Sequence, residues 1–449
     1  MNNARKNQKS TGGLPRAVSF FAGTILCFFF TASAQIDSAA NQRIFDAQLN
    51  ELLKEVLSGN PSLKAAGYKV TAASASAAAK KSLDPPQAAV EFYQAPVTSF
   101  PNPLKNQMEI DYSLQQMFPF PGKLSSMSRA EKKRSEMLEA DKQTLASDLI
   151  RDLKSAYYML YLVDRRKEIL LEKRDLLKNF EEIARKQYEV GMGSQSDILR
   201  GQTEVSLVVK DSIELEQNRI SAIAMLNALR NKPTGAAIPS LPEIRPPSIE
   251  FTIDKIMPLA ETNRPELVSM KLNTVMQQAM LNAAKKEFYP DFMVRGTYKQ
   301  MTDLPDDWAL MVGLSIPVAP WSLNKTSAGA RSSEALVSQS TQDYNAMRNM
   351  VASQIQDALA KVESNQAQIQ IIRQTIIPQA TQTLQSVVAA YQTGKQDFLM
   401  LIDAERMLLM AKEDYHMAVM NLLASQAQLE RAVGLSLDEI AQSLTGGRQ

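Results

Sequence analysis

The sequence predicts a mainly α-helical protein with a small β part, built as two similar halves. Three observations support this fold class. Residues 123–188 lack proline and glycine, and their apolar residues recur three, four and seven positions apart, as on one face of a long helix. Four short segments alternate apolar and polar residues, as half-buried strands do. The second half of the chain repeats the order of elements of the first.

The stretch 123–188 sets the dimensions of the molecule. At about 1.5 Å per residue, this helix would reach roughly 100 Å. No ordinary globular domain contains a helix of that length, so it needs long partner helices, and the rest of the chain supplies them.

The first half, 35–231, is expected to fold as two shorter helices, two strands, the long helix, a turn and a returning helix. Pro61 separates the two shorter helices, because proline cannot continue a preceding helix. Gly191 and Gly193 separate the long and returning helices, which therefore form an antiparallel hairpin. The expected ranges are 37–59 and 62–82 for the shorter helices, about 87–95 and 107–117 for the strands, 123–188 for the long helix, 189–195 for the turn and 196–231 for the return.

The second half, 263–434, follows a proline-rich linker, 232–262. Tyr391 and Gly394 stand in it where Tyr188 and Gly191 stand in the first half. The expected ranges are 264–287 for a shorter helix, about 291–300 and 307–317 for strands, 322–391 for a long helix, 392–396 for a turn and 397–433 for a return, before a tail, 435–449. Pro378 is expected to kink the second long helix.

The composition excludes several classes of function. The 50 basic and 48 acidic residues balance, and no basic block follows the N-terminal segment, so nucleic acid is not an expected partner. His416 is the only histidine and Cys27 the only cysteine. Metal sites built from His and Cys, cysteine nucleophiles and His-dependent triads are therefore not expected. We expect no catalysis and no cofactor.

Residues 1–34 are predicted to be a signal peptide. Basic residues come first, an apolar run follows from about Ala17 to Phe30, and Ala32-Ser33-Ala34 offers a cleavage site with small residues. An uncleaved membrane anchor is the alternative, although the apolar run is short for a membrane span. Cleavage before Gln35 would leave an exported chain without cysteine.

The strands are expected to form part of a barrel. Four strands cannot close one, and a lone hairpin is barely stable. The apolar faces carry Tyr112, Tyr298 and Trp308, as lipid-facing strands often do near a membrane interface. We favour a barrel closed between subunits, in which three chains would give twelve strands. The alternative is a four-stranded sheet packed on the helices of a soluble protein.

The opposite face of the strands carries charge. Glu109, Asp111, Arg295 and Lys299 lie there, and we expect them to face the lumen of the barrel. A position in an extracellular loop or at the rim is the alternative, above all for Lys299.

The doubled organisation resembles the TolC-like outer-membrane factor family. The motif Tyr-x-x-Gly-x-x-Ser occurs at Tyr188, Gly191 and Ser194, and a second copy occurs at Tyr391, Gly394 and Asp397. The resemblance covers nearly all of the chain after residue 34. It implies a homotrimer with a twelve-stranded β-barrel in the outer membrane of a Gram-negative bacterium and a helical α-barrel across the periplasm. It also implies a periplasmic adaptor (membrane fusion) protein and an inner-membrane pump, for which a proton-driven one is favoured.

The two glycine turns are the expected entrance of the tunnel. The resemblance implies that hairpin tips close the entrance and contact the adaptor, and that acidic residues near Asp197 and Asp403 line it; a ring of like charges would select cations. The glycines could instead be simple helix stops, and the aspartates could be helix-start carboxylates that favour the helix dipole. The candidate gate and tip residues are Tyr188, Gly191, Gly193, Ser194, Asp197, Tyr391, Gly394, Lys395, Asp397 and Asp403.

The solute is less well defined than the channel. Thioethers can bind soft metal ions, but the 22 methionines contain no paired motif, and core packing is the preferred explanation for those at helical spacing, Met407, Met410, Met417 and Met420. The segment from Gln115 to Lys123 resembles the heavy-metal-exporting branch of the family. Metal cations are therefore favoured over small organic toxic compounds.

Two other classes of function remain open on the sequence. A coiled-coil structural or adhesive surface protein would explain the long helices but not the alternating strands or the repeat. A secreted enzyme is disfavoured, because the chain has almost no histidine and no nucleophile motif.

Overall fold

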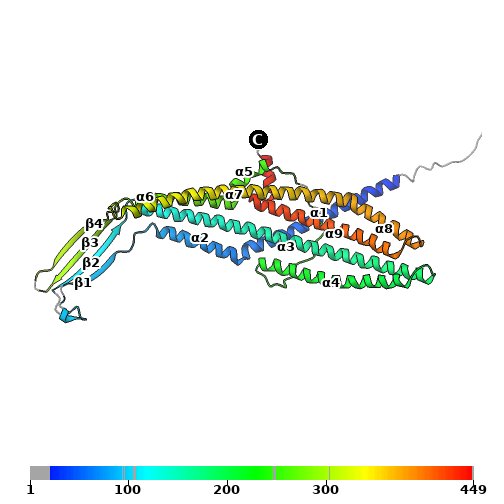
Figure 1. Ribbon diagram of the computed structural model, residues 1–449, viewed down its shortest axis with the longest axis horizontal. Coiled ribbons are helices and arrows are strands. Elements are labelled where there is room, and N and C mark those ends of the chain that lie inside the picture. The colour runs from blue at the N-terminus through cyan, green and yellow to red at the C-terminus, as the bar shows by residue number, and fades with distance from the viewer. Residues whose placement is uncertain are drawn as a thin grey trace, which may run out of the picture.

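The computed structural model describes residues 21–446, apart from residues 94, 96, 105–107, 245, 247, 248 and 303. The protein is elongated, with the strands at one end and helices running away from them (Figure 1). The elements are α1 (Phe21–Gly59), α2 (Pro61–Ala79), β1 (Gln87–Tyr93), a short 3-10 turn (Val97–Ser99), β2 (Glu109–Phe118), α3 (Lys123–Glu189), α4 (Gln195–Leu229), α5 (Ile253–Asn263), α6 (Pro265–Lys286), β3 (Phe292–Met301), β4 (Asp307–Leu314), α7 (Leu323–Ile371), a π-helical turn (Ile372–Ile376), α8 (Ile377–Gln392), α9 (Phe398–Val433) and α10 (Leu437–Gly446).

The strands form one antiparallel sheet in the order β1-β2-β3-β4, so β1 and β4 are its edges. Tyr112 pairs with Tyr298, and Tyr298 pairs with Trp308, on one face. Trp308 is 78% exposed and Val312 is 69% exposed. No helix in the described chain covers this apolar face (Figure 1). The alternative of a sheet packed on its own helices is therefore wrong.

The helices lie side by side, and α3 forms the spine of the arrangement. It packs against α2 and α6 near the sheet, and against α4 and α9 in its farther half. The second long helical run, α7 with α8, packs against α6 and then α9. Two shorter helices placed end to end thus match one long helix, and α5 and α10 lie at mid-height (Figure 1). The mainly α-helical fold with a small sheet is confirmed.

The main core lies at mid-height, where a strap crosses the helices. We define the strap as residues 236–244, which follow α4. Leu241 and Ile244 of the strap are fully buried with Tyr157 and Tyr161 of α3. Phe45 of α1 packs on the same tyrosines, 4.8 Å and 6.0 Å between ring centroids. The strap therefore closes this core and joins the two halves of the chain.

A buried carboxylate pins the strap to the helices. Asp164 of α3 is 3% exposed; it accepts hydrogen bonds from the Arg219 side chain of α4 at 2.8 Å and from the Leu241 backbone N–H at 2.9 Å. Arg219 also reaches the Ile238 carbonyl at 3.3 Å. One carboxylate thus connects α3, α4 and the strap.

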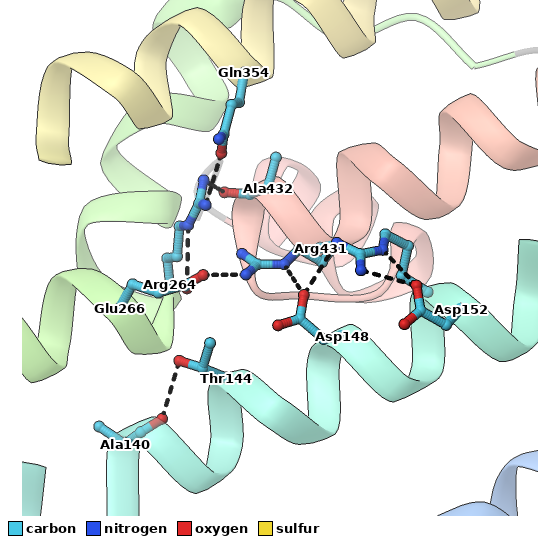
Figure 2. Close-up of polar contacts among 10 residues, drawn as sticks. Ala140, Thr144, Asp148, Asp152, Arg264, Glu266, Gln354, Arg431 and Ala432 are labelled. Carbon is cyan, nitrogen blue, oxygen red and sulfur yellow. Dashed lines mark hydrogen bonds and ion pairs between the residues drawn. The ribbon is translucent and has the colours of Figure 1, made fainter. Parts of the chain in front are cut away.

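A second polar network joins four helices at the same height (Figure 2). Arg264, at the start of α6, is 3% exposed and donates to the Ala432 carbonyl of α9 at 3.1 Å and to Gln354 of α7 at 2.7 Å. Arg431 of α9 bonds Asp148 of α3 at 2.8 Å and forms an ion pair with Glu266 of α6. Charge pairs with little exposure to solvent therefore connect the helices in the middle of the molecule. Removing one partner of such a pair strongly destabilises a protein, because the other charge is left unpaired.

The structure corrects several expected boundaries. Part of the 232–262 linker is the helix α5, because Ile256 and Ala260 are buried against α7 and α9. Part of the 435–449 tail is the helix α10, whose Ile440 is buried in the same cluster. The strand expected over 307–317 ends at Leu314, before the proline at 317, which lacks an N–H for the ladder. The end of the strand expected over 87–95 includes residue 94, outside the described residues.

Pro378 is accommodated by a change of helix type. The turn before it, Ile372–Ile376, is π-helical, and the chain remains helical on both sides. A π-helical turn widens the helix locally and often marks a functional position. The predicted kink is thus a defined local irregularity in the second long helix.

The signal peptide over residues 1–34 stays a prediction. The helix α1 begins at Phe21, inside the segment expected to be a signal peptide, and residues 1–20 lie outside the described residues. Across the part of the chain that the structure describes, no helix combines the length and apolar character needed to cross a membrane.

Removing the carboxylate of Asp164 tests the strap. Asp164→Ala leaves the partly buried Arg219 without its partner, and we expect the free energy of unfolding to fall by about 3 kcal/mol, with faster proteolysis of residues 236–244. Thermal unfolding of the purified protein in detergent measures the change. The matched control is Asp175→Ala, since that side chain is 65% exposed and should matter by less than about 0.5 kcal/mol. Equal effects of the two substitutions would contradict the role of Asp164.

Candidate functional site

The tip of the first hairpin is a tight turn that requires two glycines. Gly191 has φ +75°, which favours glycine, and the N–H groups of Met192 and Gly193 both donate to the Gln187 carbonyl, at 2.8 Å and 2.9 Å. A Cβ on Gly193 would lie 3.0 Å from Gln187 Cβ and 3.0 Å from the Tyr188 nitrogen. A side chain at this position would therefore force the neighbouring backbone of α3 to shift by a few tenths of an ångström.

The helix that leaves this turn begins with a capping box. The Ser194 side chain accepts from the Ser196 N–H at 3.1 Å, and Asp197 accepts from the Ser194 N–H at 3.5 Å. Asp197 therefore acts as a helix-start carboxylate in this structure, which supports the simpler of its two readings. A pore-ring role for Asp197 stays a prediction.

The second tip repeats this plan with different side chains. Gly394 has φ +69°, and the Lys395 N–H donates to the Ala390 carbonyl at 2.9 Å. Asp397 caps α9 by accepting from the Met400 N–H at 2.9 Å. Lys395 is exposed, and within the described residues it has no ion-pair partner. A gating role for Lys395 stays a prediction.

Among the described residues, a hydrogen bond joins the two tips, and an aromatic pair packs within the second tip. The Gln187 side chain of the first hairpin donates to the Gln392 carbonyl of the second at 2.7 Å. Tyr391 is 5% exposed and its ring lies 5.7 Å from that of Phe398, edge to face. Burial, and then the charge of Asp197, raise the pKa of Tyr391 to about 12, and its hydroxyl has no hydrogen-bond partner. Tyr188, the repeat equivalent of Tyr391, is 49% exposed.

The structure thus brings nine of the ten candidate tip residues to the two turns and places one apart. Asp403 lies farther along α9, on its exposed side, with Arg406 at 3.7 Å. Sequence reasoning missed Gln187 and Phe398, which join the hairpins, and Glu405, which is 1% exposed on the buried side of α9. A charged residue within the apolar stripe of a helix was the available signal for Glu405.

The methionine prediction is partly wrong. Met407 and Met410 are 56% and 58% exposed in the protomer, on the same side of α9 as Asp403, whereas Met420 packs against the core at mid-height. Core packing therefore does not explain the first two. Among the residues described, no group of three His, Cys, Asp or Glu side chains is arranged to hold a metal ion.

The four charged strand residues share one face of the sheet, as expected. Lys299 Nζ lies 2.6 Å from Glu109 and 3.8 Å from Asp111, and Arg295 donates to Gln115 at 2.9 Å. This face is opposite the one that carries Trp308. Whether it lines a lumen depends on how copies of the chain assemble.

Comparison with known proteins shows that both halves of the chain match one protein family. A sequence model of the family described as "Outer membrane efflux protein" matches residues 52–232 and 256–435, one segment in each half. The chain is 23% identical, over 322 residues, to the cobalt-zinc-cadmium resistance protein CzcC of Cupriavidus metallidurans; the match covers 70% of this chain and 74% of CzcC.

Solved outer-membrane proteins share the fold. The structure of the outer membrane protein VceC from Vibrio cholerae superposes with a TM-score of 0.72, at 18% identity, over 87% of this chain and 97% of VceC. CusC superposes with a TM-score of 0.72, at 19% identity, over 87% of this chain and 92% of CusC. The channel OprN gives a TM-score of 0.73 at 19% identity, over 87% and 91%.

Substituting Gly193 tests the geometry of the first tip. Gly193→Ala forces Cβ against the backbone of α3, so we expect the turn to open and local stability to fall by about 1–2 kcal/mol. Hydrogen exchange of residues 187–197 measures this. Gly67→Ala is the control: Gly67 lies in α2 with no atom within 4 Å of the added Cβ, so it should be neutral or stabilise by up to about 1 kcal/mol. Unchanged protection of residues 187–197 in Gly193→Ala would show that the turn does not need glycine at position 193.

Proposed function

We propose that this chain, which belongs to the outer membrane efflux protein family, is the outer-membrane channel-tunnel of a tripartite efflux system. The observation that carries the proposal is the open sheet: four strands with two unpaired edges, an apolar face without a cover and a charged face behind it. Such a sheet satisfies its edges and both faces only when further strands close it into a barrel in lipid.

Three copies would close the barrel. Each contributes four strands, so β4 of one copy would pair with β1 of the next and the barrel would have twelve strands. The Trp308 face would then contact lipid, and Glu109, Asp111, Arg295 and Lys299 would line the lumen. Unpaired charges on the lipid face would be destabilising, which fixes this orientation of the sheet.

The helices would continue the tunnel into the periplasm. At about 1.5 Å per residue, α3 with its 67 residues extends the wall by roughly 100 Å. The two tips would form the periplasmic entrance and the docking surface for an adaptor protein, and an inner-membrane pump, for which a proton-driven one is favoured, would supply the energy. The channel itself would conduct passively.

Metal cations are the favoured solute. The support is the similarity to CzcC, whose name refers to resistance to cobalt, zinc and cadmium. Asp403 adds a half-exposed carboxylate on α9, with Met407 and Met410 on the same side. Small organic toxic compounds remain the second class to be tested.

A reconstitution experiment tests the function. In detergent, the purified protein should run as a trimer. In a planar bilayer, it should give discrete conductance steps. A coiled-coil structural or adhesive surface protein would give neither conductance nor a trimer with twelve paired strands, and such a result would end the proposal.

Neutralising Asp403 tests the entrance. If three Asp403 side chains form a ring, Asp403→Asn should weaken block by divalent cations and reduce cation selectivity several-fold, because the local negative potential is lost. Single-channel recording in asymmetric salt measures both properties. Asp438→Asn, at an exposed position on α10 and outside the exposed stripe of α9, should change neither by a comparable amount. Unchanged block and selectivity in Asp403→Asn would remove this residue from the conducting path.

A further inference from the structure

The seam between the two hairpins changes character along its length. The seam is the contact of α3, from the first hairpin, with α9, from the second. From mid-height toward the tips it is fastened by ion pairs between the two helices, namely Asp148–Arg431, Lys154–Glu430, Arg166–Glu413 and Glu172–Lys412. This regular pairing stops at Glu172–Lys412, and the next acidic residue of α9 on the buried side is Glu405.

Glu405 is a buried carboxyl group without a partner. Its side chain is buried, 1% exposed, and within the described residues it forms no ion pair; its Oε1 atom has no hydrogen-bond donor. The charged groups that face it are Lys173 and Glu172 on α3, Glu204 on α4 and Arg406 on α9. The helix α8 contributes no charged residue, and Tyr391 is its only titratable group.

Three of these four neighbouring charges are themselves paired, and Lys173 forms no ion pair with Glu405 among the described residues. Glu172 is paired with Lys412, and Arg406 lies 3.8 Å from Glu204 and 3.7 Å from Asp403. The pKa of Glu405 is raised to about 7, mainly by burial; Lys173 and Arg406 oppose the shift, and the carboxylates of Glu204 and Glu172 add to it. An ionised carboxylate in this position would lack water and a direct ion pair, which is unfavourable.

From Glu405 to the tips, among the described residues, the two hairpins are held together by apolar contacts and one hydrogen bond. Leu177 and Phe180 of α3 pack with Phe398 and Leu401 of α9, and the Gln187–Gln392 bond closes the end. The π-helical turn Ile372–Ile376 lies on the braced side of Glu405, where Ile372 is buried in the mid-height core and the turn contacts α9. The tip third of the seam is therefore the part that can separate while the braced middle stays fixed.

We propose that Glu405 is a proton-binding site in this seam, which holds the two hairpins together when protonated and favours their separation when ionised. The consequence for conduction rests on the proposed function: separation of the hairpins would widen the periplasmic entrance. The ligand is the proton, and the site responds in the range of periplasmic pH.

The sign of the effect follows from linkage. In the packed seam the pKa of Glu405 is about 7, compared with 4.5 for the solvated group. The packed state therefore binds the proton more tightly, is fully favoured below pH 4.5 and loses stability as the pH rises toward 7. Between pH 5 and pH 8, the ratio of packed to separated hairpins should fall on the order of 50-fold per protomer.

Glu405→Gln tests the site, because glutamine keeps the shape of a protonated carboxyl group and cannot ionise. Hydrogen exchange of residues 172–184 and 398–408 in the full-length protein, compared between wild type and variant at each pH, reports seam opening. We expect the protection of wild type and variant to agree within about fivefold at pH 5 and to be much greater in the variant, by well over tenfold, at pH 8. Asp414→Asn, an exposed carboxylate on the same helix, is the control and should match wild type at both values.

Channel recording provides the second measurement. The open probability of wild type should rise between pH 5 and pH 8, and that of Glu405→Gln should stay at its value for pH 5. If no conductance is seen at all, the proposed function fails, and hydrogen exchange still decides the role of Glu405. Equal protection of wild type and Glu405→Gln at pH 8 would overturn the site. A pH response of the open probability that persists in the variant would also overturn it.

Discussion

The structure depends on the fact that one protomer is an open wall. Its sheet has two free edges. Most of its helices pack against the helices beside them within one layer, and among the described elements no second layer covers them. Unpaired edge strands and an uncovered apolar face are unfavourable in water and, for the edges, also in lipid. The same constraint explains why the strands alternate strictly, since one face must suit lipid and the other an aqueous path. It also explains why side chains such as Met407 are exposed on a helix that otherwise belongs to the core.

An open wall of this length needs a rigid middle. Asp164 ties the strap to α3 and α4, and Arg264 and Arg431 tie α3, α6, α7 and α9 together, all at mid-height. Buried pairs of this kind are weak sources of net stability, but they penalise any alternative arrangement of the helices they join. Toward the tips, the interactions become apolar and sparse, so the tips can move about a fixed centre. The proposed site at Glu405 lies at the boundary between these two regimes.

The sequence was sufficient for the parts of the fold that repeat along the chain. Helical spacing placed α3 within one residue of its observed end at Glu189, and alternation placed all four strands, because both patterns are local and period-specific. It did not reveal α5 and α10, since these short helices are stabilised mainly by burying Ile256 and Ile440 against distant segments. Gln187 and Glu405 were missed for a related reason. Their roles depend on which helix faces them across the seam, and the local sequence pattern of one helix does not predict its partner.

The most informative differences are those between the two repeats, because the shared backbone plan is only the scaffold. The returning helix of the first half, α4, packs mainly on α3, with α9 also in contact through the Glu204–Arg406 pair, and exposes Val209, Ile213 and Ile220, at 57%, 71% and 62%. Its equivalent α9 is packed on both sides and exposes a carboxylate and thioethers instead. In the proposed trimer, an edge helix with an apolar face suits contact with the next subunit, because apolar area gains stability when it leaves water. A central helix with a charged face suits the aqueous path. In the proposed trimer, the first repeat would thus serve assembly and the second conduction, and the selective groups of the tunnel would lie on the second hairpin.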